Sequence, residues 1–225
     1  MSQRLVLERT DGRHVDITIT DRDDGDFHID NPSTLDRRAQ LTAEPWVVVR
    51  QIHSARVVDA APGAEPVEAD AILTHTSDLP IAVQGADCAP IALSTLDGPI
   101  AVAHVGWRGL VGGVIEETID QLGEIPNTAI VGPTICPACY EFSAQDLDLV
   151  AAKYGDDVRG TTSTGTPALD MTAGIRRVLV DAGVADIRFA AGCTACGAAG
   201  FSHRQRKDVE RHALVAVLRE GPHGR

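Results

Sequence analysis

The stretch from Ala82 to Gly109, AVQGADCAPIALSTLDGPIAVAHVGWRG, decides the fold. Two apolar segments, 90–95 and 99–105, are separated by Leu96-Asp97-Gly98. An Asp-Gly pair between β-rich runs is a strong hairpin signal. Such a hairpin would bring Cys88, just before its first strand, towards His104 at the end of its second strand.

The residues after this hairpin predict a helix. Gly106-Trp-Arg-Gly109 leads into apolar residues with helical spacing, from Val111 to Leu122. The first turn of a helix favours anions through its free N–H groups and its dipole. A thiol, an imidazole, the Arg108 guanidinium and a helix N-terminus would then meet at one edge of a sheet. We expect a functional site there.

The rest of the chain predicts an α+β or mixed α/β fold, with mixed sheets covered by helices. The sequence shows no internal repeat and no clear linker, which favours a single domain over residues 1–225. Helices with good caps are expected after Thr34, Ser143 and Asp170. The expected strands and hairpins cover residues 3–20, 46–53, 55–60, 69–74, 79–83, 127–131 and 187–190, with an uncertain strand at 27–29. We also expect a flexible connection at 157–168 and a final helix at 205–219.

Composition and charge restrict the function classes. The 225 residues are 44% hydrophobic, and 32 acidic against 20 basic residues give a net charge of −12. This balance argues against nucleic acid or an anionic membrane as the main partner. The first residues contain no signal-like apolar core, and no later run reaches the roughly 18 apolar residues of a spanning helix. We therefore expect a cytoplasmic protein, a monomer or weak homodimer, whose five cysteines serve a metal or catalysis rather than disulfides.

His53, Cys88 and His104 are the first candidate constellation. Each ends or precedes a predicted strand, and two imidazoles with one thiolate are a known zinc ligand set that leaves a fourth position open. Zinc there would lower the pKa of a bound water to about 7. The spacing matches no compact metal motif, so a buried cysteine with two hydrogen-bonded histidines explains it equally well. A second functional interpretation makes Cys88 a nucleophile and His104 its base.

Two CxxC pairs, Cys136/Cys139 and Cys193/Cys196, form the second constellation. Zinc knuckles usually separate such pairs by about 15–20 residues, whereas 53 residues lie between Cys139 and Cys193. Three interpretations stay open: a second zinc, a redox pair, or small buried side chains. The sequence favours the last.

Other polar residues could serve the site. Arg108 has the planar donor fork that suits phosphate or carboxylate. Asp87 beside Cys88, and Glu141 in a proline-restricted loop, could carry protons or orient a ligating imidazole. The basic run 203–207, HRQRK, is typical of a solvated face.

These motifs resemble those of a known family, the YfiH-type proteins, also described as laccase-domain polyphenol oxidases and as purine nucleoside phosphorylases. The resemblance covers about residues 46–211. It rests on RQIH at 50–53, ADAILT at 69–74, ADCAPI at 86–91, HVGWRG at 104–109, GPTI at 132–135, CYE at 139–141, LD at 169–170, CT at 193–194 and FS at 201–202.

The resemblance implies an α+β fold of mixed β-sheets packed between helices, similar to that of a toxin-type cysteine hydrolase. It also implies a zinc ion held by His53, Cys88 and His104. It also implies phosphorolysis of adenosine, inosine, guanosine and methylthioadenosine, and hydrolytic deamination of adenosine. Purine nucleoside and phosphate would be the partners, with no nucleic acid and no membrane involved. Cys88, His104, Asp87 and Glu141 are the expected catalytic residues, and Arg108, Gln51 and Asp70 the expected substrate-binding or phosphate-binding residues.

The resemblance also implies alternative activities. One is a copper-dependent polyphenol oxidase, although multicopper chemistry needs more histidines than a three-ligand set supplies. Another is a Cys88–His104 hydrolase or amidase acting on peptidoglycan precursors, and a third is a protein that binds without turnover. The chain departs from the family pattern at Ser54, Cys136, Cys196 and His203.

Overall fold

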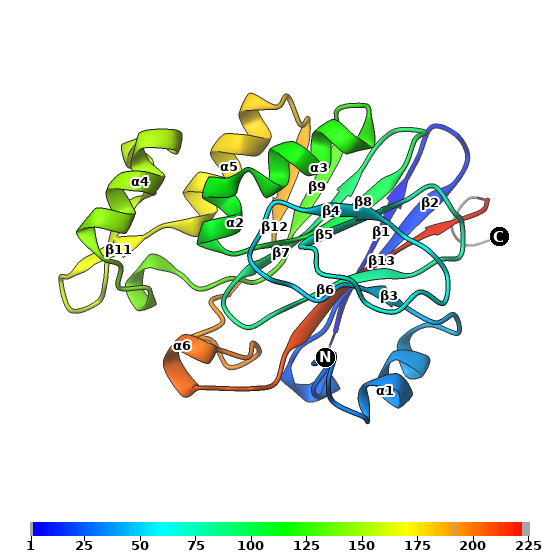
Figure 1. Ribbon diagram of the computed structural model, residues 1–225, viewed down its shortest axis with the longest axis horizontal. Coiled ribbons are helices and arrows are strands. Elements are labelled where there is room, and N and C mark those ends of the chain that lie inside the picture. The colour runs from blue at the N-terminus through cyan, green and yellow to red at the C-terminus, as the bar shows by residue number, and fades with distance from the viewer. Residues whose placement is uncertain (1, 191, 222–225) are drawn as a thin grey trace.

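The computed structural model describes residues 2–190 and 192–221, and consists of two mixed β-sheets that pack face to face (Figure 1). The first sheet has five strands in the order β1 (Gln3–Glu8), β2 (His14–Ile19), β13 (His212–Arg219), β6 (Ile81–Gly85) and β3 (Val47–Val48). The strands pair antiparallel except for β3 with β6.

The second sheet has six strands and is also mixed. Its order is β12 (Asp186–Phe189), β9 (Thr128–Val131), β7 (Ala89–Ser94), β8 (Ile100–Val105), β5 (Ala71–Thr74) and β4 (Val57–Asp59). The central pairs are antiparallel, and the two outermost pairs are parallel.

Helices cover the outer faces of both sheets. The outer face of the six-stranded sheet packs on α2 (Trp107–Gly112), α3 (Val114–Leu122), α4 (Ala144–Tyr154) and α5 (Met171–Asp181), along the upper side of Figure 1. Phe27, Trp46 and α1 (Thr34–Leu41) cover the five-stranded sheet, on the opposite side. The predicted α+β arrangement, with mixed sheets between helices, is confirmed. Among the described residues, no helix is both long and apolar enough to span a bilayer.

The predicted hairpin is confirmed and forms the centre of the six-stranded sheet. β7 and β8 pair antiparallel, with Ala89 opposite Val105 and Pro90 opposite His104. Both strands are buried along their whole length. This register places Cys88 next to the end of β8. The helix that follows is interrupted at Gly113, whose φ of +88° separates α2 from α3.

The predicted helix caps at two sites are confirmed. The Ser143 hydroxyl accepts a hydrogen bond from the Asp146 N–H, and Gly155 ends α4. The Asp170 carboxylate accepts one from the Ala173 N–H at the start of α5. At α1 the cap is Ser33 rather than Thr34, and the Thr34 hydroxyl instead donates to the His28 carbonyl.

The predicted helix over 205–219 is wrong. The structure has a short α6 (His203–Arg206) followed by the strand β13, which lies between β2 and β6. Leu214, Ala216 and Leu218 face the core between the sheets, whereas Ala213, Val215 and Val217 face the layer below. Because both faces are buried, the polar alternation that marks a half-exposed strand is absent, and the apolar run was mistaken for a helix.

Three smaller expectations are also corrected. The segment 157–168, expected to be a flexible connection, contains the hairpin of β10 (Arg159–Thr161) and β11 (Pro167–Leu169). The expected strand 46–53 is reduced to β3, and the chain then turns, so that His53 has a φ of +60°. Residues 27–29 form no strand. Three short 3-10 helices complete the described elements: η1 (Arg22–Asp24), η2 (Pro137–Cys139) and η3 (Asp156–Val158).

His212, the first residue of β13, makes the stability of this fold dependent on pH. Its ring is fully buried, and neither ring nitrogen has a hydrogen-bond partner among the described residues. Burial, against the attraction of Asp87, lowers the pKa of His212 from its usual 6.5 to about 4. The contribution of neutral His212 to the free energy of unfolding is therefore complete above pH 6.5. It is lost as the pH falls towards 4, because the unfolded chain takes up the proton at a higher pH than the folded protein does.

We predict that His212 alone lowers the free energy of unfolding by about 2 kcal/mol between pH 7 and pH 5. This corresponds to a loss of roughly 4–8 °C in Tm. Thermal unfolding at both pH values measures it, and His212→Gln should shrink the difference whatever its Tm at pH 7. The control His75→Gln removes an exposed imidazole and should leave the difference as in the wild type. An equal difference in all three proteins would contradict this role of His212.

Candidate metal centre and its cavity

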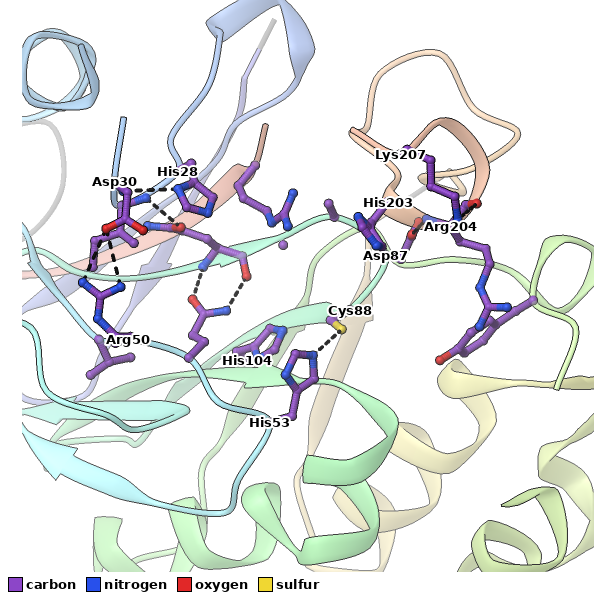
Figure 2. A pocket seen from close by; sticks show the side chains of 18 residues that line it. His28, Asp30, Arg50, His53, Asp87, Cys88, His104, His203, Arg204 and Lys207 are labelled. Carbon is purple, nitrogen blue, oxygen red and sulfur yellow. Dashed lines mark hydrogen bonds and ion pairs between the residues drawn. The ribbon is translucent and has the colours of Figure 1, made fainter. Parts of the chain in front are cut away.

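His53, Cys88 and His104, predicted as one constellation, meet at one end of the two sheets. His53 lies in the turn between β3 and β4, Cys88 directly precedes β7, and His104 is the penultimate residue of β8. One ligand atom of each lies within 4.8 Å of the others. The Cys88 Sγ is 3.7 Å from the His53 Nε2, and the two imidazole rings meet edge to face at 4.9 Å (Figure 2).

The fully buried carboxylate of Asp70, just before β5, orients both histidines. Its Oδ1 accepts hydrogen bonds from the His104 Nδ1 at 2.9 Å and from the His53 backbone N–H at 3.0 Å. Its Oδ2 accepts from the backbone N–H groups of Ile52 and Ser54 and from the Ser54 hydroxyl. One carboxylate therefore fixes the His104 ring and the sharp turn that presents His53.

This arrangement fits a metal ion. A carboxylate only accepts hydrogen bonds, so the His104 Nδ1 carries a proton and its Nε2 is the nitrogen that can bind a metal once it is deprotonated. A carboxylate behind a ligating imidazole is the usual outer partner in zinc sites. Two imidazoles and one thiolate satisfy the ligand preferences of zinc and leave a fourth position open. Copper shares the affinity for this ligand set.

The backbone at the centre is adapted to the close approach of these groups. A Cβ atom added to Gly106 would lie 2.6 Å from the His53 ring and 3.1 Å from the Cys88 Sγ. The glycine of the HVGWRG motif is therefore needed for space. His53 and Asp87 have positive φ angles of +60° and +97°, which are uncommon for residues other than glycine.

The charges of Cys88 and His104 stabilise each other. Burial raises the pKa of the Cys88 thiol, but the adjacent His104 and His53 rings outweigh this and bring it to about 6. Burial lowers the pKa of His104, and the charges of Cys88 and Asp70 reverse this and raise it to about 9. In the metal-free protein the two residues therefore form a thiolate–imidazolium pair at neutral pH.

Asp87 connects the centre to two neighbouring loops. Its carboxylate accepts hydrogen bonds from the Thr194 hydroxyl at 2.7 Å and from the Arg204 backbone N–H at 2.6 Å. Its carbonyl oxygen accepts from the Thr134 hydroxyl and the Ile135 N–H. The side chain is buried but still lines the cavity, and each carboxylate oxygen has capacity for one further hydrogen bond.

The three candidate ligands line a cavity of about 640 Å³, which is within the usual range for small-molecule sites. Its rim is basic although the whole chain is acidic. His28, Asp30 and Arg50 lie on one side of the ligands in Figure 2, and His203, Arg204 and Lys207 on the other. The remaining lining residues are Ile29, Val49, Gln51, Gln84, Gly85, Ala86, Asp87, Tyr140 and Arg211.

The structure brings some of the other predicted site residues to the cavity and not others. Gln51 lines the cavity, although its side-chain amide donates to the Gln84 carbonyl and accepts from the Gln84 N–H. Asp70, expected to bind substrate, is fully buried behind the histidines and does not line the cavity. Arg108 is exposed, stacks on Trp107 at 4.4 Å and does not line the cavity. Glu141 is also exposed and outside the lining, because its backbone bridges to Ala168.

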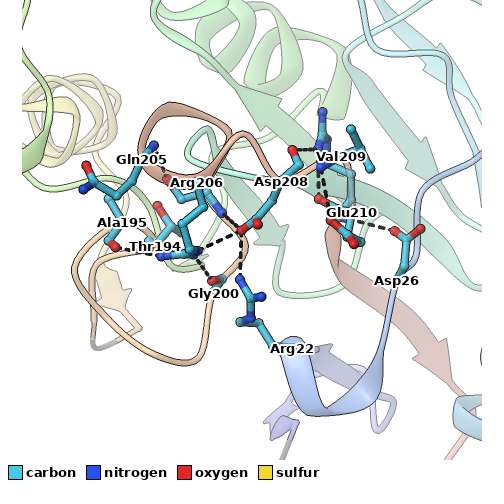
Figure 3. A network of polar contacts seen from close by, with 12 residues as sticks. Arg22, Asp26, Thr194, Ala195, Gly200, Gln205, Arg206, Asp208, Val209 and Glu210 are labelled. Carbon is cyan, nitrogen blue, oxygen red and sulfur yellow. Dashed lines mark hydrogen bonds and ion pairs between the residues drawn. The ribbon is translucent and has the colours of Figure 1, made fainter.

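The basic run 203–207, interpreted from sequence as a solvated face, instead supplies part of the rim. Its position is fixed by Arg206, which donates to the carbonyls of Thr194, Ala195 and Gly200 and pairs with Asp208 (Figure 3). Arg204 is left facing the cavity, with its guanidinium 5.0 Å from the centre of the Tyr140 ring. The sequence signals that this run belongs to the site were the nearby Phe201-Ser202 motif and the departure from the family pattern at His203.

Comparisons with known proteins identify related sequences. The family described as multi-copper polyphenol oxidoreductase laccase matches residues 10–219. A purine nucleoside phosphorylase of Streptomyces coelicolor is 34% identical over 200 residues, which cover 82% of each chain. An adenosine deaminase from an unknown prokaryotic organism is 30% identical over 202 residues, covering 80% of this chain and 77% of its own.

Solved structures show the same fold. The crystal structure of a Neisseria meningitidis protein, NMB0706, superposes with a TM-score of 0.85 at 27% identity, covering 96% of this chain and 99% of that one. Bacillus licheniformis YfiH superposes with a TM-score of 0.80 at 22% identity, covering 96% of both chains. The family match over nearly the whole chain, the relatives and these folds lead to one conclusion: the chain belongs to the laccase-like YfiH family.

Proposed function

We propose that this protein is a zinc-dependent purine nucleoside enzyme that catalyses phosphorolysis of nucleosides and hydrolytic deamination of adenosine. The observation that carries the proposal is the set His53, Cys88 and His104 at a cavity whose rim is basic. The purine nucleoside phosphorylase and adenosine deaminase names of its relatives agree with it.

The cavity offers separate groups for the two halves of a nucleoside phosphorolysis. Arg204 and Lys207 line the cavity, form no side-chain ion pair with a carboxylate among the described residues, and suit an inorganic phosphate. Burial and then the Cys88 charge raise the pKa of Tyr140 to about 12, so its hydroxyl stays a neutral hydrogen-bond donor. An oxygen of the bound phosphate would attack C1′ of the ribose and form the new C–O bond. The glycosidic C1′–N bond would break, and the electron pair of that bond would leave with the purine.

Deamination needs an activated water and a proton carrier. Zinc bound to His53, Cys88 and His104 would supply a Lewis acid that makes hydroxide available at neutral pH. Asp87 is the carboxylate of the lining that directly adjoins Cys88, and we assign it the transfer of a proton to the departing ammonia. Glu141 is not given this role because of its position outside the cavity.

A cysteine hydrolase is the second candidate, favoured by one specific observation. Asp70, His104 and Cys88 stand in the order of a carboxylate–imidazole–thiol triad, and the pKa of Cys88 is about 6. Such an enzyme, acting on an amide of a peptidoglycan precursor, would use the same residues without a metal. Chelation therefore separates the two functions: it abolishes the zinc-dependent activity and leaves a thiol-dependent one intact.

We predict that Cys88→Ala loses both the metal of this site and nucleoside turnover. The variant removes the only sulfur ligand, so zinc content should fall by about one equivalent, and adenine and inosine should no longer form from adenosine with or without phosphate. Metal analysis and chromatography of the products measure the two effects. Full nucleoside turnover by chelated wild type, with loss in Cys88→Ala, would contradict the zinc enzyme and assign the turnover to the Cys88 thiol.

Asp70 should act on metal affinity rather than on substrate. Asp70→Asn keeps the shape of the side chain but removes the charge that holds the His104 proton on Nδ1. We expect zinc affinity to fall about 10–100-fold, measured by competition with a chromogenic chelator. The matched control Asp30→Asn alters a cavity carboxylate that pairs with Arg50, and should not change zinc affinity. Equal affinities in the wild type and Asp70→Asn would refute the positioning role.

Alanine variants of Arg204 and Arg108 should differ in their effect on phosphate binding. A lost charge-assisted contact is worth about 1.5–3 kcal/mol, so Arg204→Ala should raise the KM for phosphate by roughly 10–100-fold and spare deamination. Arg108→Ala removes an exposed guanidinium outside the cavity and should leave this KM unchanged. Steady-state phosphorolysis over a range of phosphate concentrations measures both, and the reverse result would move the phosphate site to Arg108.

A further inference from the structure

The four cysteines of the two CxxC pairs form a second cluster that the proposed function does not use. The Sγ atoms of Cys136, Cys139, Cys193 and Cys196 all lie within 4.8 Å of one another. All four residues are free thiols and none lines the nucleoside cavity. The sequence favoured small buried side chains, but three of the four cysteines are partly exposed and Cys196 is exposed.

The topology explains how pairs so far apart in sequence meet. β9 and β12 are parallel neighbours, so their carboxyl ends emerge at the same edge of the six-stranded sheet. Each strand leads into a loop that contains one CxxC. A parallel bridge between Thr134 and Cys193 holds the two loops side by side. The intervening residues form α4, the β10–β11 hairpin and α5, and do not separate the loops in space.

The spacing of the sulfur atoms suits a tetrahedral ion. A Zn–S bond of about 2.3 Å puts ligand sulfurs about 3.8 Å apart, and the Cys136 and Cys196 Sγ atoms are 3.9 Å apart. A disulfide would need about 2.05 Å.

Backbone hydrogen bonds also favour thiolates in the second loop. The Cys193 Sγ accepts hydrogen bonds from the Cys136 N–H at 3.2 Å and from the Ala195 N–H at 3.3 Å. The turn is closed by the Gly197 N–H donating to the Cys193 carbonyl. A Cβ atom on Gly197 would lie 2.3 Å from that oxygen, so only glycine fits.

We propose that Cys136, Cys139, Cys193 and Cys196 bind a structural zinc ion. With four protein ligands the site is closed, which distinguishes it from the three-ligand centre at His53, Cys88 and His104. Zinc is favoured over magnesium or calcium because all four ligands are soft sulfur atoms. The site connects two loops that share no helix or long strand pairing of their own.

The connection has a consequence for the nucleoside cavity. Thr134, from the first loop, donates to the Asp87 carbonyl at 2.6 Å, and Thr194, from the second, donates to the Asp87 carboxylate at 2.7 Å. Both threonines lie within two residues of a cysteine of the cluster. Zinc in the cluster would therefore hold Asp87, and with it Cys88, through both loops.

Zinc stoichiometry tests the proposal. Protein purified under reducing conditions should hold two zinc ions in the wild type, one in Cys88→Ala, one in the double variant Cys136→Ser/Cys196→Ser, and none when all three changes are combined. Loss of zinc in Cys88→Ala alone reports on the proposed function, whereas loss in the double variant reports on the cluster. The two proposals can thus fail separately.

Two further measurements keep the test valid if the double variant folds poorly. Cys196→His should retain the second zinc, because three cysteines and one histidine are also a structural zinc set, whereas Cys196→Ala should lose it. In the Co²⁺-loaded protein, the cluster should contribute strong thiolate-to-metal absorption that persists in Cys88→Ala and disappears in the double variant.

Three results would overturn the zinc cluster. The first is equal zinc content in the wild type and the double variant. The second is iron instead of zinc at the cluster in protein grown with both metals. The third is a pair of disulfides among the four cysteines, found by non-reducing mass spectrometry of protein isolated under reducing conditions.

Discussion

The candidate centre depends on one buried carboxylate. Asp70 is fully buried, and it is compensated by the His104 ring and by three successive backbone N–H groups of the turn at 52–54. Without that anion the turn would have no partner for its N–H groups, and the left-handed backbone of His53 would have no support. The same oxygen atoms thus fix a ligand from a loop and a ligand from a central strand.

The strand pairing determines which groups can meet at this end of the sheets. The register of β7 with β8 sets Cys88 beside Gly106, and the absence of a side chain there admits the His53 ring. Parallel pairing of β9 with β12 brings the two cysteine loops together at the same edge. Asp87 accepts hydrogen bonds from both loops, so the cavity wall and the cysteine cluster are directly connected.

The sequence correctly predicted the turns and helix caps that depend only on neighbouring residues. The Asp-Gly hairpin and the caps at Ser143 and Asp170 were found because a few adjacent residues specify them. β13 was missed because its burial on both faces comes from partners far away in the chain. The meeting of His53, Cys88 and His104 could be expected, because each lies at the end of a predicted strand. The cationic rim and the position of Arg108 and Glu141 outside the cavity could not, because they depend on loops that are far apart in the chain.

The most direct test of the proposed metal enzyme is reconstitution. Protein freed of metal would be titrated with zinc while adenine and inosine formation from adenosine and phosphate is followed. Activity should be absent at first and should rise in proportion to the zinc equivalent that Cys88→Ala cannot bind. Full turnover by the metal-free protein, unchanged by added zinc, would contradict the account.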